Sequence, residues 1–178
     1  IGERNCLDRL PAARTYRAGS FIRILEIPGD MYRSFIERND LSDSIGEYLE
    51  RKHFLEGTHL LGDRIAGITL SGIAQEMVEL RASRDETIVP DGSLILIAEG
   101  RVGVYCYNKF IGTAGASEAI GETELLGEAR FEMHYAAKSD VRYYAVPCEM
   151  IRQIPIVSWK LLEQLNRRVQ SCRAIFQE

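Results

Sequence analysis

The 178-residue sequence has few of the features that mark secreted, membrane-spanning or nucleic-acid-binding proteins. Its four cysteines are scattered and form no C-x-x-C pair, which predicts reduced core thiols rather than a disulfide framework. Its longest apolar runs, such as Leu94–Ala98, are far too short to cross a bilayer. The net charge is -4 and the pI is near 5.5, so the basic surface of a general nucleic-acid binder is also missing.

The first residues, 1–4, contain neither an initiator methionine nor the apolar core of a signal peptide. We therefore expect a cytoplasmic protein, and we interpret the sequence as a fragment of a longer one. The histidines His53, His59 and His134 have no metal-ligand spacing relative to the cysteines, so no metal site is expected.

No arrangement of catalytic side chains stands out, and we expect no enzyme. Ser71 and Ser117 lie outside any G-x-S-x-G frame and have no partnered histidine. The glycine-containing stretch 112–117 lacks the strand-glycine-Lys-Ser pattern of a phosphate loop, which favours a flexible loop over a phosphate cradle.

The sequence does contain an internal repeat, with an offset of 119 residues from Ile1 to Ile120. The triplet 1–3, Ile-Gly-Glu, recurs as 120–122. The same register, without a gap, gives the identities Leu7/Leu126, Tyr16/Tyr135, Ala18/Ala137, Ser20/Ser139, Arg23/Arg142, Pro28/Pro147, Met31/Met150 and Arg33/Arg152. A self-match at one fixed period indicates a duplication.

Short β-rich segments alternate with helical ones along the chain. We expect strands at 21–27, 86–89, 94–98, 101–107, 135–137 and 141–146. We expect helices at 31–38, from about 41 to 49, at 65–78 and from about Ser158 to the end. This pattern predicts a mainly β fold, a β-roll or jelly-roll barrel flanked by N- and C-terminal helices.

The last helix carries an apolar stripe with two interpretations. Its members are Leu162, Leu165, Val169, Cys172 and Phe176. The stripe either packs back on the barrel or forms a seam for a homodimer or an output domain. Arg167 and Arg168 are interpreted as part of a solvated face.

Several motifs occur in an order that resembles a known family. They are the entry segment 54–62 (Phe-Leu to Leu-Leu-Gly), G-R-V-G-V at 100–104, Ile-Gly-Glu at 120–122 and Ala-Lys-Ser-Asp at 137–140. This order resembles the cyclic-nucleotide-binding domain of bacterial catabolite activators, protein kinase A regulatory subunits and cyclic-nucleotide-gated channels. The resemblance implies that residues 1–53 are the C-terminal part of a first such domain and residues 54–178 a second one.

The resemblance also implies a ligand site. In the family, backbone N–H groups of the short helical turn after Gly-Glu hold a phosphate, and the Glu accepts a hydrogen bond from the ribose 2′-hydroxyl. The ligand would be cAMP, cGMP or a related nucleotide, with no other cofactor. Carried onto this sequence, the ligand-binding residues are Gly121, Glu122, Thr123, Arg130, Phe131 and Glu132 in the second copy, and Gly2, Glu3 and Arg14 in the first.

Both copies depart from the family at the arginine that neutralises the phosphate. Ala12 and Phe131 occupy the two arginine positions, while Arg14 falls two residues late and Arg130 one residue early. Arg130 replaces the missing side chain only if the loop slips by one residue. Loss of such an arginine should cost about 2–4 kcal/mol, roughly a hundredfold or more in affinity.

The front of the expected barrel is short. The turn at 90–92 passes directly into the next strand, and residues 104–120 leave little room for a strand, a turn and a strand. Two explanations stay open here, namely reduced loops and residues missing from the sequence.

Three functional hypotheses follow. The first is a ligand sensor that relays nucleotide binding to its C-terminal helices. The second is a domain that has lost its ligand and serves as an interaction scaffold, which a pocket filled by Phe131 or Tyr135 would favour. The third is a transcription factor of the catabolite-activator type, which requires a helix-turn-helix that residues 1–178 do not contain.

Overall fold

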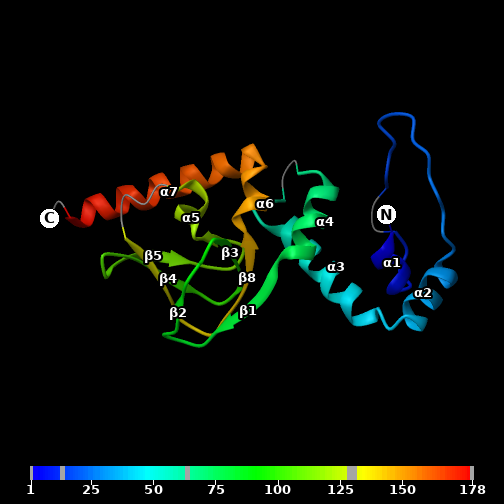
Figure 1. Cartoon of the computed structure of the whole chain (residues 1–178), viewed down its shortest axis with the longest axis horizontal. Coiled ribbons are helices and arrows are strands. Elements are labelled where there is room, and N and C mark those ends of the chain that lie inside the picture. Colours follow the sequence, from blue (N-terminus) through cyan, green and yellow to red (C-terminus); the bar gives the residue numbers. More distant parts are fainter. Residues whose placement is uncertain (1, 13–14, 63–64, 128–131, 177–178) are drawn as a thin grey trace. The chain divides into compact units, whose positions relative to one another are not determined.

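The computed structural model describes residues 2–12, 15–62, 65–127 and 132–176. It divides into two compact units, Ile1–Glu50 and Arg51–Glu178. The second unit is a roll of two four-stranded antiparallel sheets with helices around it (Figure 1). One sheet has the order β1-β8-β3-β6 and the other β2-β7-β4-β5. The strands are β1 (Val78–Ala82), β2 (Thr87–Ile88), β3 (Ser93–Glu99), β4 (Val102–Cys106), β5 (Lys109–Ala114), β6 (Ala119–Ile120), β7 (Met133–Ala137) and β8 (Val141–Pro147).

The core of the roll lies between the two sheets. Its buried members are Ala82, Ile88, Ile95, Ile97, Val102, Val104, Ala114, Ile120, Tyr135, Ala137 and Val141. In β3, residues 94–97 are all buried, which means that both faces of this strand are covered. A strand covered on both faces reads as a continuous apolar run instead of an alternating one, as Leu-Ile-Leu-Ile does here. Helical residues pack on the outer face of this sheet. For example, the ring centroids of Phe54 and of Tyr144 in β8 lie 4.9 Å apart.

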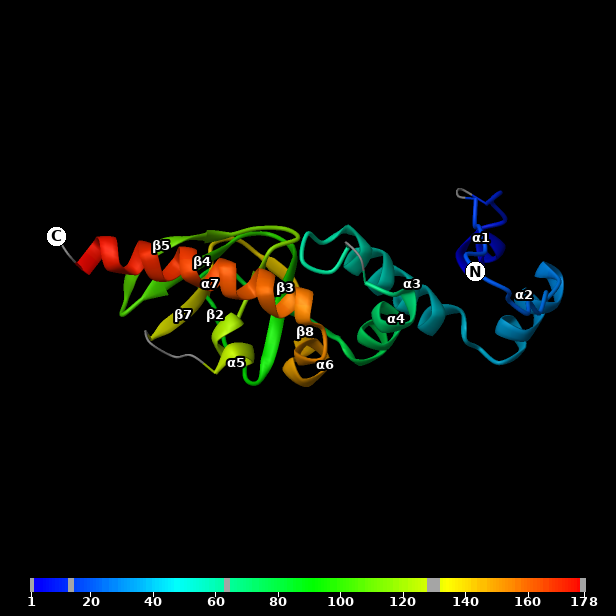
Figure 2. The ribbon, with the colours of Figure 1, turned by 90° about the horizontal axis from the view of Figure 1, so that it is seen from above.

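Five helices accompany or enter the second unit: α3 (Ser42–Gly57), α4 (Gly67–Glu76), α5 (Glu122–Leu126), α6 (Cys148–Arg152) and α7 (Pro155–Phe176). Helix α7 runs along the roll with the short α5 beside it (Figure 2). Val157, Leu161, Leu165 and Cys172 are buried at helical spacing. Leu165 and Cys172 of the predicted stripe therefore pack on the roll, as the first of its two interpretations expects.

Most of the predicted strands of the roll are confirmed. The short stretch 104–120 does contain a strand, a turn and a strand, because β5 follows β4 after a tight turn at Tyr107 and Asn108, both with positive φ. Strand β1 was not predicted, since the helical periodicity of residues 65–78 runs into its first residue. The chain therefore builds this part of the roll with short connections.

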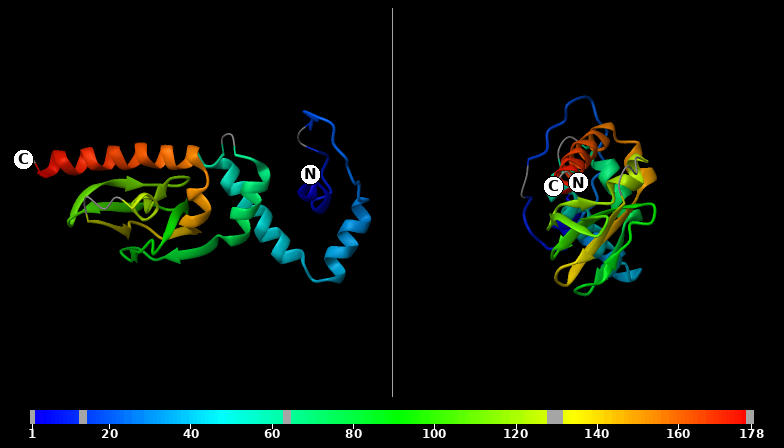
Figure 3. Two further views of the ribbon diagram at one scale, coloured as in Figure 1. Left: turned by 45° about the horizontal axis from the view of Figure 1, so that its top comes forward. Right: turned by 90° about the vertical axis from the view of Figure 1, so that its left-hand side faces the viewer.

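The first unit contains α1 (Glu3–Leu7), α2 (Gly29–Arg38) and the N-terminal part of α3. The expected strand at 21–27 is wrong, because this stretch pairs with no neighbouring strand among the described residues and follows an extended path before α2 (Figure 3). A β-strand is stable only when its N–H and C=O groups bond to a neighbouring strand. Among the described residues, no helix combines the length and the hydropathy needed to cross a bilayer.

Candidate functional site

The candidate site is the turn between β6 and α5. Gly121 stands at the N-cap of α5 with φ 87° and ψ 19°, in the left-handed region that L side chains rarely adopt. A Cβ at this position would lie 2.9 Å from Pro90 Cβ and 3.0 Å from the Ser93 carbonyl oxygen. The turn thus requires glycine both for its backbone angles and for its close contact with the segment before β3.

Glu122 follows this glycine and is almost fully buried, with 1% of its surface exposed. Its carboxylate is held by Arg168 of α7, whose Nη1 lies 2.6 Å from Oε1 and 2.5 Å from Oε2. A carboxylate without a partner would be very costly in such an environment, so the arginine permits the burial. The pair links residues 46 positions apart and attaches α7 to the turn.

Two further hydrogen bonds attach α7 to the same place. Arg168 Nη2 donates to the Ala119 carbonyl oxygen at 3.0 Å, and Gln164 Nε2 donates to that oxygen at 2.7 Å. The interpretation of Arg168 as part of a solvated face is therefore wrong, because only 15% of its side chain is exposed. Arg167 is exposed, as expected.

Tyr135 of β7 closes the turn from inside the roll. Its side chain is buried, and its hydroxyl accepts a hydrogen bond from the Gly121 N–H at 3.3 Å. Burial, with the nearby Glu122 charge as a second cause, raises the pKa of Tyr135 to about 12. Hydrogen bonding to Thr123 and to the Gly121 backbone acts in the opposite direction. The tyrosine is therefore neutral at physiological pH and caps a backbone N–H of the turn.

Replacing Tyr135 with phenylalanine is expected to reduce the alkaline loss of stability. Because the folded pKa of about 12 exceeds the ordinary value of 10.0, this group's contribution is complete below pH 10 and is lost as the pH rises through 12. Between pH 8 and pH 11 the wild type is expected to lose about 1.4 kcal/mol more unfolding free energy than Tyr135→Phe, because other groups with raised pKa values, such as Tyr143 and Tyr144, titrate in both proteins. Urea unfolding at pH 8 and pH 11 measures this difference, and equal pH dependence in the two proteins would contradict it.

The structure brings together three of the residues predicted for the second copy: Gly121, Glu122 and Thr123. Glu132 is exposed, and among the described residues no hydrogen bond or ion pair joins its side chain to the turn. Arg130 and Phe131 lie outside the described residues, and so does Arg14 in the first copy.

In the first unit, Gly2 and Glu3 form the equivalent turn. Gly2 is the N-cap of α1 with φ 86°, and Glu3 is half-buried.

Sequence reasoning missed Arg168 as a site residue. Its signal was an arginine placed on the buried stripe of α7, three residues after Leu165 and four before Cys172. In the described part of the chain, no group of three His, Cys, Asp or Glu side chains could hold a metal ion.

Comparison with known proteins identifies the fold. No family model and no curated protein sequence matches the chain. Solved structures do match it, among them cAMP-bound PfPKA-R, with a TM-score of 0.65 and 15% identity over 82% of this chain and 52% of that one. The regulatory subunit of a cAMP-independent protein kinase A from Trypanosoma cruzi, bound to guanosine, matches with a TM-score of 0.60 and 18% identity over 83% and 56% of the two chains.

A third match is a triple variant of the corresponding Trypanosoma brucei subunit, in which one change introduces an arginine and which is bound to cAMP in its A site. Its TM-score is 0.62, with 16% identity over 83% of this chain and 57% of that one. The present chain thus spans little more than half the length of these structures. At such identities the likeness shows the fold, which is the β-roll of cyclic-nucleotide-binding domains, as the motif order predicted.

Proposed function

We propose that residues 51–178 form a regulatory, non-catalytic module that senses a nucleoside or nucleotide at the turn after Gly121-Glu122. The observation that carries this proposal is the buried Glu122 carboxylate, placed directly after a left-handed glycine and held by Arg168 of α7. A carboxylate of this kind can accept a hydrogen bond from a ribose hydroxyl while it stays paired with its arginine. The carboxylate is then shared between ligand and helix.

The same ion pair offers a route from the ligand to the C-terminal helix. A ligand hydroxyl that bonds to Glu122 competes with or reorients Arg168, and Arg168 and Gln164 also hold the Ala119 carbonyl. Ligand binding therefore changes the free energy with which α7 docks on the roll. Such a change acts as a switch only if the ligand has different affinities for the docked and undocked states. Partners of the module, a second copy or an output domain, would respond to the position of α7.

The ligand class follows from the residues at the phosphate position. Phe131 stands in place of the family's arginine, so the cyclic phosphate contributes little to the binding affinity. The nucleoside part of the ligand then supplies most of it. Two of the matched structures agree with this reasoning, since a cAMP-independent subunit is bound to guanosine, and a variant carrying a new arginine is bound to cAMP. We therefore propose a purine nucleoside or a nucleotide bound mainly through its base and ribose.

Calorimetric titration with guanosine, cAMP, cGMP and a cyclic dinucleotide tests this function. We expect guanosine and the two cyclic mononucleotides to bind with similar affinity, because the family's arginine position holds no arginine that would neutralise the phosphate. The variant Phe131→Arg should tighten cAMP binding by roughly a hundredfold and change guanosine binding by less than about threefold. Ala12→Arg, the equivalent change in the first copy, is the matched control and should leave every affinity unchanged. No heat from any ligand at millimolar concentration, in the wild type and in Phe131→Arg, would refute the sensor.

One observation favours the scaffold as a second candidate function. The two groups that would meet a ligand already have protein partners, since the Gly121 N–H donates to Tyr135 and both Glu122 oxygens bond to Arg168. Such a roll would need no ligand to satisfy the polar groups of this turn. It would serve to present its sheet edges and α7 to other proteins.

A further inference from the structure

Two of the four cysteines meet inside the second unit. Cys106 is the last residue of β4, and Cys172 lies in the C-terminal part of α7. Both are free thiols, and both are 0% exposed. A hydrogen bond joins the two side chains, although the residues are far apart in the sequence. The fold therefore places two thiol groups against each other where a strand meets the last helix.

The pairing of β4 with β7 shows which way Cys106 points. Cys106 stands opposite Met133, and this pair continues the register in which Val102 and Val104 enter the core between the sheets. Side chains alternate between the two faces of a strand, so Cys106 points to the same inner face as the two valines. Its thiol therefore extends the buried interior of the roll toward the end of β4.

Helix α7 brings Cys172 to the same interior. Cys172 follows Leu161 and Leu165 on the buried stripe of this helix. The helix also packs on β5, the hairpin partner of β4, and Figure 1 and Figure 2 both show its C-terminal part at this end of the roll. The register of a strand and the stripe of a helix thus agree in placing the two thiols on one contact.

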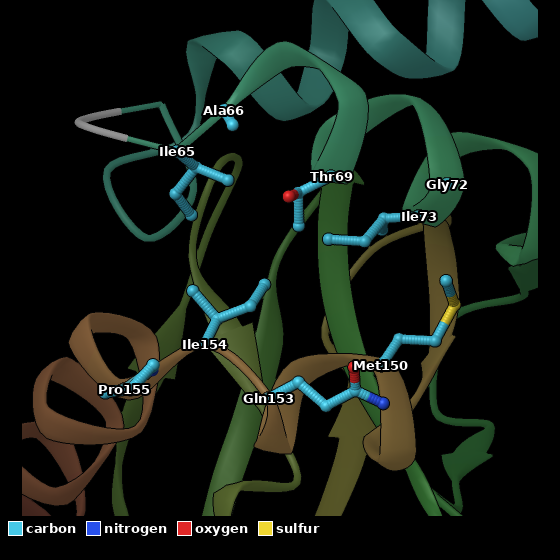
Figure 4. Close-up of a pocket in the computed structure, with 9 residues that line it drawn as sticks. All are labelled: Ile65, Ala66, Thr69, Gly72, Ile73, Met150, Gln153, Ile154 and Pro155. Atoms are coloured by element: carbon cyan, nitrogen blue, oxygen red, sulfur yellow. The ribbon is translucent and has the colours of Figure 1, made fainter.

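Cys148 provides a contrast, because it is also buried but lies at the other end of α7. It begins α6, whose Met150 lines a pocket with Ile73 of α4 (Figure 4). Helix α7 starts only after this, at Pro155, and a helix rises about 1.5 Å per residue, so Pro155 and Cys172 stand about 25 Å apart. A disulfide needs Cα atoms within about 7 Å of each other. Cys148 is therefore out of reach of Cys172 while α7 is docked.

We propose that Cys106 and Cys172 form a reversible disulfide when the protein is exposed to hydrogen peroxide, and that this bond locks α7 in its docked position. One thiolate attacks the peroxide, so that an S–O bond forms, the O–O bond breaks and water leaves. The second thiol attacks the resulting sulfenic acid, so that the S–S bond forms, the S–O bond breaks and a second water leaves. The two sulfurs lose two electrons, the peroxide gains them, and both thiol protons end in the two waters.

The burial of the pair makes this reaction depend on the position of α7. Burial, with the hydrogen bond to Cys106 as a second cause, raises the pKa of Cys172 to about 12, so its thiolate is scarce at neutral pH. Because the thiolate is the nucleophile, oxidation requires that the last turns of α7 open transiently and admit peroxide. The disulfide then prevents the opening that allowed it to form. This inference concerns the thiols alone and is independent of the ligand proposed for the turn.

Peptide mapping of the oxidised protein tests the proposal. The reduced 178-residue chain is treated with hydrogen peroxide at neutral pH, its remaining thiols are alkylated, and the digest is analysed by mass spectrometry without reduction. We expect one dominant linked pair, which contains Cys106 and Cys172, and a fall from four alkylatable thiols to two. Dithiothreitol should restore all four. The second unit should unfold about 10 °C higher in the oxidised protein than in the reduced one.

Cys148→Ser is the matched control and should form the same linked pair with the same rise in unfolding temperature. Cys172→Ala should form no link to Cys106, and peroxide should leave its unfolding temperature unchanged. The map of the wild type decides the question even without a folded Cys172→Ala variant. A dominant link between any other pair, a link between chains whose yield rises with concentration, or oxidation of Cys106 and Cys172 to sulfinic acid without a link would overturn the proposal. Thiols that all stay reduced after prolonged treatment would overturn it as well.

Discussion

Replacing Arg168 with methionine is expected to lower the free energy of unfolding of the second unit by about 3 kcal/mol. The substitution leaves the Glu122 carboxylate buried without its charged partner, although methionine retains much of the apolar volume of the arginine stem. It also removes the bond to the Ala119 carbonyl oxygen, which keeps only its contact with Gln164. The loss is placed at the lower end of the range for buried pairs because 15% of the Arg168 side chain is exposed.

Urea unfolding followed by the fluorescence of Trp159 measures this effect, since the single tryptophan of the chain lies on α7. Arg167→Met is the matched control, because this neighbouring arginine is exposed, and its change should stay within about 0.5 kcal/mol. The double variant Glu122→Gln with Arg168→Met removes both charges and should recover more than half of the loss. A loss in Arg168→Met no larger than in Arg167→Met would contradict a structural ion pair.

The turn at Gly121-Glu122 could be predicted from the sequence because its signals are local. A glycine followed by an acidic residue at a helix start reflects backbone angles and the helix dipole, which depend on neighbours in the chain. The partner of Glu122 could not be predicted in the same way. Arg168 is 46 residues away, and only the packing of α7 on the roll brings it to the carboxylate.

For the segment 21–27, the local sequence predicted a strand that does not form. Its β-branched and aromatic residues favour a strand, and propensity alone predicts one. Strand formation nevertheless depends on partners that bond to the backbone, and the described residues of the first unit provide none. The predicted strands of the second unit did form, because each of them pairs with a neighbouring strand.

The missed strand β1 has a similar explanation. Val78–Ala82 alternates apolar and polar residues only over a few positions, directly after the buried helix α4. Its pairing with β8 settles the conformation, and that pairing joins residues 59 to 67 positions apart. Local pattern was sufficient for the fold class, while the edges of the sheets depended on long-range contacts.

Replacing Gly121 with alanine is expected to cost about 3 kcal/mol of unfolding free energy. The left-handed backbone, with φ 87°, costs an alanine about 1 kcal/mol. The added Cβ would also stand 2.9 Å from Pro90 Cβ and 3.0 Å from the Ser93 carbonyl oxygen, and the second of these is backbone that cannot turn away. Relieving that overlap shifts the turn against β3 and accounts for about 2 kcal/mol more.

The variant Gly127→Ala, on the same helix, separates the cost of the left-handed backbone from the cost of the steric overlap. Gly127 caps the C-terminus of α5 with φ 66°, and a Cβ there would meet no atom of the described residues within 4 Å, so only the backbone cost of about 1 kcal/mol is expected. Urea unfolding of both variants should therefore show a difference of about 2 kcal/mol. In ligand titrations Gly121→Ala should also weaken any binding at the turn more than Gly127→Ala does, because the displaced Glu122 loses its alignment with Arg168. Equal stability of the two variants would show that the turn tolerates a side chain against Pro90, and the fixed geometry assigned to Glu122 would then be wrong.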